Sequence, residues 1–140
     1  MVPHHSNISA AEYEQARKFI LSSVKNNSRY VNGKVLGNHY IFYKDLADLL
    51  GFTIDSAHDG DRMGWVAGEA SELEFSKHRV LIGALVISRD FRRPGMGFYW
   101  LAQQKKLFIV PGTKPDPDGL VELNFWARHV EQVVKYYGGR

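Results

Sequence analysis

Positive charge and backbone constraint occur together in residues 89–98, directly after an apolar run at 80–87. Arginine side chains bind phosphate through paired N–H donors, and proline and glycine favour a tight turn. The cations are Arg89, Arg92 and Arg93, and the residues expected to fix the loop geometry are Pro94, Gly95 and Gly97. Basic side chains held on a turn are typical of contacts with a phosphate backbone. This stretch therefore indicates a contact surface and not a reaction.

Two further cations, Lys105 and Lys106, follow three consecutive aromatic residues at 98–100. Basic residues interleaved with aromatic ones are typical of surfaces on which the bases of single-stranded nucleic acid stack. The alternative interpretation is that at least two of these rings pack in the core. The glycine spacing matches neither the Walker A nor the dinucleotide motif. We therefore expect the loop to hold phosphates of a nucleic-acid backbone.

Acid–base chemistry would need two carboxylates close together, or a carboxylate beside a histidine. Glu69 and Glu72 are three residues apart and share one face of an expected helix. Glu69 lies between small residues, so it could face a pocket that also contains His78 and Arg89. Such a pocket would define a small ligand-binding protein or a hydrolase. The alternative is that Glu69 is a solvated acid on a helix surface.

Residues of metal-binding type occur in the middle of the chain, but their spacing matches no metal-binding motif. The side chains considered are His58, Asp59, Asp61, Glu69 and His78. We interpret them as helix-capping acids and surface histidines, and predict neither a metal nor a cofactor. The chain has no cysteine, which excludes disulfides and a thiol nucleophile.

The charges are divided unevenly along the chain, although its net charge is only +3. Residues 45–74 contain eight acidic side chains and one basic, and residues 77–106 contain seven basic and one acidic. One interpretation is that the two segments pack together and neutralise each other. The other is a basic contact face with acidic helices elsewhere.

The first half of the sequence contains clear local signals. Ser9 and Glu12 form a capping box that predicts a helix to about residue 26. The pair at 32–33, Asn-Gly, predicts a tight hairpin turn within residues 29–36. Residues 43–50 carry a helical apolar pattern that ends at Gly51.

The second half is expected to add three helices and two strands. A helix capped by Asp59 or Asp61 should run to about residue 75, and the apolar run 80–87 should form a strand with both faces covered. Short elements are predicted at 98–104, a helix, and at 107–110, a strand. The last helix should follow Asp118 as its cap and end at Gly138.

These patterns together predict one domain, 1–140, in which residues 1–8 form a flexible N-terminus. The fold class expected is α+β, mostly helical, with a short β-hairpin and a central buried strand, and of winged-helix-like character. No secretory signal is evident and no apolar run is long enough to span a bilayer. We therefore expect a cytoplasmic protein without membrane contact, whose oligomeric state is open.

Four segments resemble an uncharacterised group of small hypothetical proteins of bacteria and phages. The segments are 43–51, 62–69, 80–98 and 125–137. They supply a helix ending in leucine and glycine, a second helix, an apolar strand with a Pro-Gly-x-Gly-Phe turn, and a closing aromatic helix. The resemblance covers about residues 40–137. It carries no functional residues, because no activity is secure for the group.

The same order of helix, helix, strand and glycine turn is similar to the winged-helix domain of alkylguanine-DNA alkyltransferases. Those enzymes carry a Pro-Cys-His-Arg-Val motif where this chain has residues 77–80 and no cysteine. Alkyl transfer is therefore excluded, and the resemblance implies only a DNA-binding architecture.

The function predicted first is a non-enzymatic nucleic-acid-binding module. Its phosphate contacts would be Arg89, Arg92, Arg93, Lys105 and Lys106. The first alternative is a small phage-type interaction or inhibitor protein that docks on a larger enzyme through the acidic segment 55–74 or the C-terminal helix. The second alternative is the ligand-binding protein or hydrolase with a pocket centred on Glu69.

Overall fold

The computed structural model describes residues 8–52 and 57–139, and the side chains of these residues except 57–61. Within this part the helices are α1 (Ala10–Asn27), α2 (Tyr43–Leu50), α3 (Ala57–His78), α4 (Met96–Gln104) and α5 (Leu120–Tyr137). The strands are β1 (Ser28–Val31), β2 (Lys34–Gly37), β3 (Ile41–Phe42) and β4 (Val86–Ile87). The predicted mostly helical α+β class with a short hairpin is confirmed.

The capping box at the start of α1 is confirmed. The Glu12 N–H donates to Ser9 Oγ at 3.2 Å, and the Ser9 N–H donates to Glu12 Oε1 at 2.9 Å. Ile8, which precedes the cap, is buried in the core. The remainder of the N-terminal segment expected to be flexible, 1–7, lies outside the described residues.

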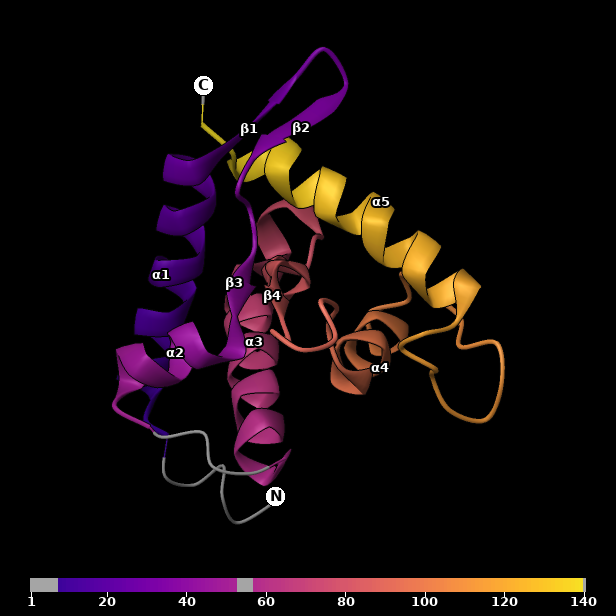
Figure 1. Cartoon of the computed structure of the whole chain (residues 1–140), viewed down its shortest axis with the longest axis horizontal. Coiled ribbons are helices and arrows are strands. Elements are labelled where there is room, and N and C mark those ends of the chain that lie inside the picture. The colour runs from indigo at the N-terminus through magenta and orange to yellow at the C-terminus, as the bar shows by residue number, and fades with distance from the viewer. Residues whose placement is uncertain (1–7, 53–56, 140) are drawn as a thin grey trace.

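The predicted turn at 32–33 joins β1 to β2 as an antiparallel hairpin in which Tyr30 pairs with Val35. Asn32 and Gly33 both have positive φ, 51° and 76°, as a type I′ turn requires. The hairpin lies beside the C-terminal end of α5 (Figure 1), where Arg29 forms a bridge with Gly139.

Helices α1, α3 and α5 surround the segment 80–87, which passes through the middle of the molecule (Figure 1). Every residue from Val80 to Ile87 is buried. The prediction that both faces of this segment are covered is therefore confirmed. No helix among the described residues is long and apolar enough to cross a membrane.

The central segment departs from the prediction in its backbone, because only β4 is a strand and Ile82–Leu85 forms a 3-10 helix. β4 pairs in parallel with β3, and Val86 lies opposite Ile41. Two backbone N–H groups of the segment that precedes β4 donate hydrogen bonds to side chains of the surrounding helices. The Leu81 N–H donates to His129 Nε2 and the Gly83 N–H to Ser71 Oγ, both at 2.7 Å. Because helices supply these acceptors, a neighbouring strand is not needed.

Replacing Gly83 by alanine is expected to destabilise the protein by about 2 kcal/mol. A Cβ at this position would lie 2.8 Å from Ser71 Oγ and 3.0 Å from the Ala67 carbonyl oxygen. Gly97→Ala is the matched control, because a Cβ there meets nothing within 4 Å. In a helix that change should be neutral or stabilising by up to about 1 kcal/mol. Urea unfolding of both variants measures the difference, and equal midpoints would contradict the close packing at Gly83.

Several predicted boundaries were wrong. α3 begins at Ala57, so Asp59 and Asp61 lie inside the helix and not at its N-cap position. α5 has Gly119 as its N-cap, and Asp118 instead pairs with an arginine. Residues 107–110 form no strand. These errors share a cause, since acidic residues near a helix start and short apolar runs fit more than one local structure.

Candidate nucleic-acid interface

The arginine loop, defined here as residues 88–95, is held by its own hydrogen bonds. The Arg92 N–H donates to the Ser88 carbonyl at 2.8 Å, and the Ser88 N–H donates to the Arg93 carbonyl at 3.1 Å. At its end the Gly95 N–H donates to the hydroxyl of Tyr43, the first residue of α2, at 3.0 Å. The loop is therefore fixed to α2 before any partner binds.

Arg89 and Arg92 lie together. Their guanidinium carbons stand 5.1 and 5.3 Å from the centre of the same ring, that of Phe42. Both residues are exposed, and among the described residues neither forms an ion pair. Arg92 has a φ of 60°, a left-handed conformation uncommon for arginine. The fold thus places two guanidinium groups, neither of them in an ion pair with a described residue, beside one aromatic ring.

Phe91 stands between these arginines in the sequence, and 68% of it is exposed. Its N–H donates to Ser88 Oγ at 3.3 Å, and the guanidinium of Arg93 lies 4.9 Å from its ring centre. Sequence reasoning did not select this ring. The available signal was an aromatic residue among three arginines in a loop that has little apolar material to cover it.

Arg93 and Lys105 are both paired with carboxylates. Arg93 Nε lies 2.5 Å from Asp118 Oδ1, and its Nη2 lies 3.1 Å from Asp118 Oδ2. This hydrogen-bonded pair lowers the pKa of the Asp118 carboxyl. Lys105 contacts Glu72 on α3 and stands over the Phe75 ring. These two side chains are thus occupied within the molecule, unlike Arg89 and Arg92.

Lys106 is exposed after α4 and has a φ of 63°. Its N–H donates to the Gln103 carbonyl at 3.0 Å, which closes the end of that helix. The described contacts do not link Lys106 to the arginine loop. The five predicted cations therefore have different neighbours, and the fold brings only the two arginines on Phe42 together.

The three predicted turn residues occupy different positions. Pro94 is buried, and Gly95 is the N-cap of α4. Gly97 lies inside the first turn of that helix, with open space where a side chain would be. Gly95 anchors the loop through its hydrogen bond to Tyr43, whereas Gly97 makes no close approach that requires glycine.

The aromatic run 98–100 mostly packs inward. Tyr99 is fully buried, Phe98 is half-buried against it, and Trp100 remains 42% exposed. Burial raises the pKa of the Tyr99 hydroxyl. Two of these three rings thus serve the core, as the alternative interpretation held, and only Trp100 is available to a partner.

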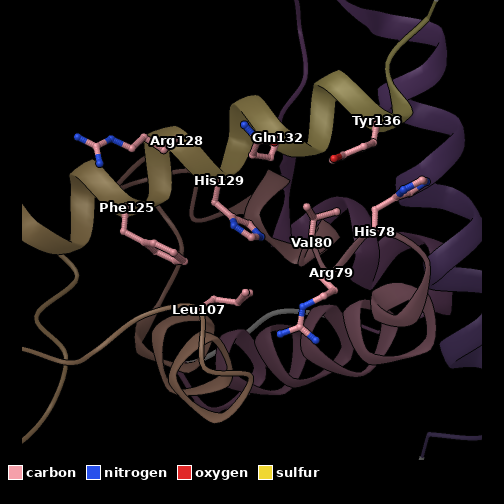
Figure 2. A pocket seen from close by; sticks show the side chains of 9 residues that line it. All are labelled: His78, Arg79, Val80, Leu107, Phe125, Arg128, His129, Gln132 and Tyr136. Carbon is pink, nitrogen blue, oxygen red and sulfur yellow. The ribbon is translucent and has the colours of Figure 1, made fainter.

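Glu69 and His78 lie on α3, nine positions apart in the sequence. Glu69 is half-buried, and burial, with the neighbouring Glu72 charge, raises its pKa. His78 stacks on Tyr136 with centroids 4.4 Å apart and lines a pocket of about 340 Å³ (Figure 2). Glu69 and Arg89 do not line this pocket. The fold does not bring the three residues of that hypothesis together here.

Among the described side chains, no group of three His, Asp or Glu residues is placed to hold a metal ion. The side chains of His58, Asp59 and Asp61 lie outside the described part of the chain, so this statement does not extend to them.

Comparison of the chain with protein-family models, with curated proteins and with solved structures gives no match.

Proposed function

We propose that this protein binds nucleic acid through the arginine loop and catalyses no reaction. The observation that carries the proposal is the placement of Arg89 and Arg92 over Phe42, where neither is paired with a described carboxylate. Two such guanidinium groups on a preformed loop can each bind a phosphate of a strand, because each presents several N–H donors in a fixed plane.

Phe91 extends this proposal to single-stranded nucleic acid. An exposed ring beside phosphate-binding arginines offers a surface on which a base can stack. The Arg93 guanidinium on one side of Phe91 holds the loop to Asp118, so Arg93 has a positioning role. We expect phosphates at Arg89 and Arg92 and one unstacked base on Phe91.

With a duplex as the partner, the same loop would be used in a winged-helix-like arrangement. α2 and α3 are in contact, and the arginine loop is fixed to the first residue of α2. In winged-helix domains a helix pair meets the nucleic acid while a following loop contacts its backbone. Here α2 and α3 would supply the helix pair, and residues 88–95 would supply the loop.

Replacing Arg89 and Arg92 together by glutamine is expected to weaken binding of a short fluorescent single strand roughly tenfold or more at about 0.1 M salt. The plot of log affinity against log salt should become shallower by about 1.4, because two phosphate contacts are lost. Fluorescence anisotropy over a range of salt concentrations measures both quantities.

The control removes the same charge elsewhere, with Lys18 and Lys25 on α1 both changed to glutamine. That variant should retain the salt dependence of the natural chain. Equal affinity and slope in the arginine variant and the natural chain would contradict the proposal, as would equal losses in both variants, which would indicate attraction by net charge alone.

A second candidate function is an interaction protein that docks through its C-terminal helix. Ile109 is 85% exposed, and Leu120 and Val121 in the first turn of α5 are 74% and 53% exposed. Exposed apolar side chains of this kind are typical of protein contacts. A pull-down that retains one stoichiometric protein and no nucleic acid would favour this candidate over the first.

A further inference from the structure

The pocket beside His78 is formed by three parts of the chain: the end of α3, the segment after α4, and α5. Val80 and His129 form its buried floor, and Leu107 and Phe125 are half-buried beside them. Figure 2 shows the rings of Phe125 and His129 reaching down from α5, while Arg79 lies on the opposite side. The pocket therefore has an aromatic side and a cationic side.

His129 has a defined tautomer. Its Nε2 accepts the Leu81 N–H at 2.7 Å, so in the neutral ring the proton is on Nδ1. Burial lowers the pKa of this ring to about 4, and the ring is therefore neutral near pH 7. Nδ1 has no hydrogen-bond partner among the described residues. His129 thus contributes an unused N–H donor at the floor of the pocket.

The charge of the pocket is positive. Arg79 and Arg128 are among its lining residues, and no acidic residue is. Within the described part of the chain neither arginine forms an ion pair, although Arg79 lies over the Phe75 ring at 5.1 Å. Figure 2 shows Arg79 on the side of the pocket opposite α5 and Arg128 directed outward at the rim. An anion entering the pocket would therefore meet Arg79.

Aromatic rings line the pocket on both sides of Arg79. Phe125 and His129 stack with centroids 5.3 Å apart, and His78 and Tyr136 stack at 4.4 Å. A volume of about 340 Å³ lies at the small end of the range for ligand pockets and suits a ligand of one ring system and one anionic group.

We propose that this pocket binds a nucleoside 5′-phosphate, either as a free mononucleotide or as the phosphorylated end of a strand. The phosphate binds Arg79, and the base lies against Phe125 and His129, where the Nδ1–H donates to it. The proposal stands on the pocket alone and does not use the arginine loop.

Titration with adenosine 5′-monophosphate, followed by backbone amide NMR shifts, tests the site. The shifts should be largest near Val80, Leu107 and Gln132, and affinity should exceed that for adenosine or inorganic phosphate. Arg79→Asn should weaken binding roughly tenfold or more, because a charge-assisted contact is lost. Asparagine suits this position, where Arg79 has a φ of 56°.

Lys135→Asn is the matched control, since Lys135 is exposed on α5 and does not line the pocket. It should leave the affinity for the nucleotide unchanged, as should the glutamine variant of Arg89 and Arg92. Absence of shifts at the pocket, or equal affinity in Arg79→Asn and the natural chain, would overturn the proposal. These results are independent of strand binding by the arginine loop.

Competition distinguishes the two sources of the ligand. A short strand with a 5′-phosphate that displaces the mononucleotide, while the same strand without the phosphate does not, would identify a strand end as the occupant. Failure of both strands to displace it would identify the free mononucleotide. Displacement by both strands equally would overturn the requirement for the phosphate at Arg79.

Discussion

Replacing Glu74 by alanine is expected to destabilise the protein by about 3 kcal/mol, since it removes two hydrogen bonds to a buried carboxylate. Glu74 is 1% exposed on α3. Its Oε1 accepts a hydrogen bond of 2.6 Å from Nη1 of Arg17, which lies on α1. Its Oε2 accepts a hydrogen bond of 2.7 Å from the hydroxyl of Tyr137, which lies on α5. One carboxylate therefore joins three helices, and urea unfolding measures its contribution.

The protonation of Glu74 follows from the same contacts. Burial alone would raise its pKa, but the hydrogen bonds from Tyr137 and Arg17 outweigh burial and lower it. A carboxyl with a lowered pKa in the folded state stabilises the fold above its unfolded pKa, and that stabilisation is lost as the pH falls through the folded value. The effect of the alanine change should therefore shrink in acid.

Glu72→Ala on the same helix is the control for Glu74. Glu72 is paired with Lys105 but is much more exposed, and a surface pair of this kind contributes about 0.5 kcal/mol or less. Tyr137→Phe should give an intermediate loss of about 1 kcal/mol from one hydrogen bond. Equal unfolding midpoints for the two alanine variants would contradict the network that we describe.

Acid should destabilise this protein through His129 as the pH falls from about 6.5 to about 4. Burial lowers the pKa of His129 from 6.5 to about 4. Between these values the unfolded chain binds a proton that the folded ring does not, so the free energy of unfolding falls as the pH falls. The total loss is about 3 kcal/mol, because the pKa is 6.5 in the unfolded chain and about 4 in the folded one.

His129→Gln isolates this contribution. The amide oxygen of glutamine can still accept the hydrogen bond of the Leu81 N–H, but the amide binds no proton in this pH range. The variant should be less stable at neutral pH but should show a flatter dependence between about pH 4 and 6.5. Unfolding free energies at several pH values measure the two slopes. Parallel curves for the variant and the natural chain would show that His129 is not buried in its neutral form.

Several elements could be predicted from the sequence because neighbouring residues determine them. The two hydrogen bonds of the capping box join Ser9 and Glu12, which lie within one helical turn of each other. The positive φ of Asn32 and Gly33, and the end of α2 at Gly51, are local backbone preferences. The burial of residues 80–87 also followed from composition, since a continuous apolar run has no face suited to water.

The backbone form of that buried run depended on residues far away in the sequence. Leu81 and Gly83 donate to His129 and Ser71, whose side chains reach them from α5 and α3. A pattern of apolar residues shows that a segment is buried, but it does not show which groups will accept its N–H bonds.

The availability of the cations at the candidate interface also depends on residues that are distant in the sequence. The sequence by itself located a loop that carries three arginines next to proline and glycine. Only the tertiary structure decided which cations are free, because Asp118 pairs with Arg93 across 25 positions and Glu72 pairs with Lys105 across the contact between α3 and the end of α4. The type of charge is a property of the residue, whereas its availability to a partner depends on which distant carboxylate the folded chain places beside it.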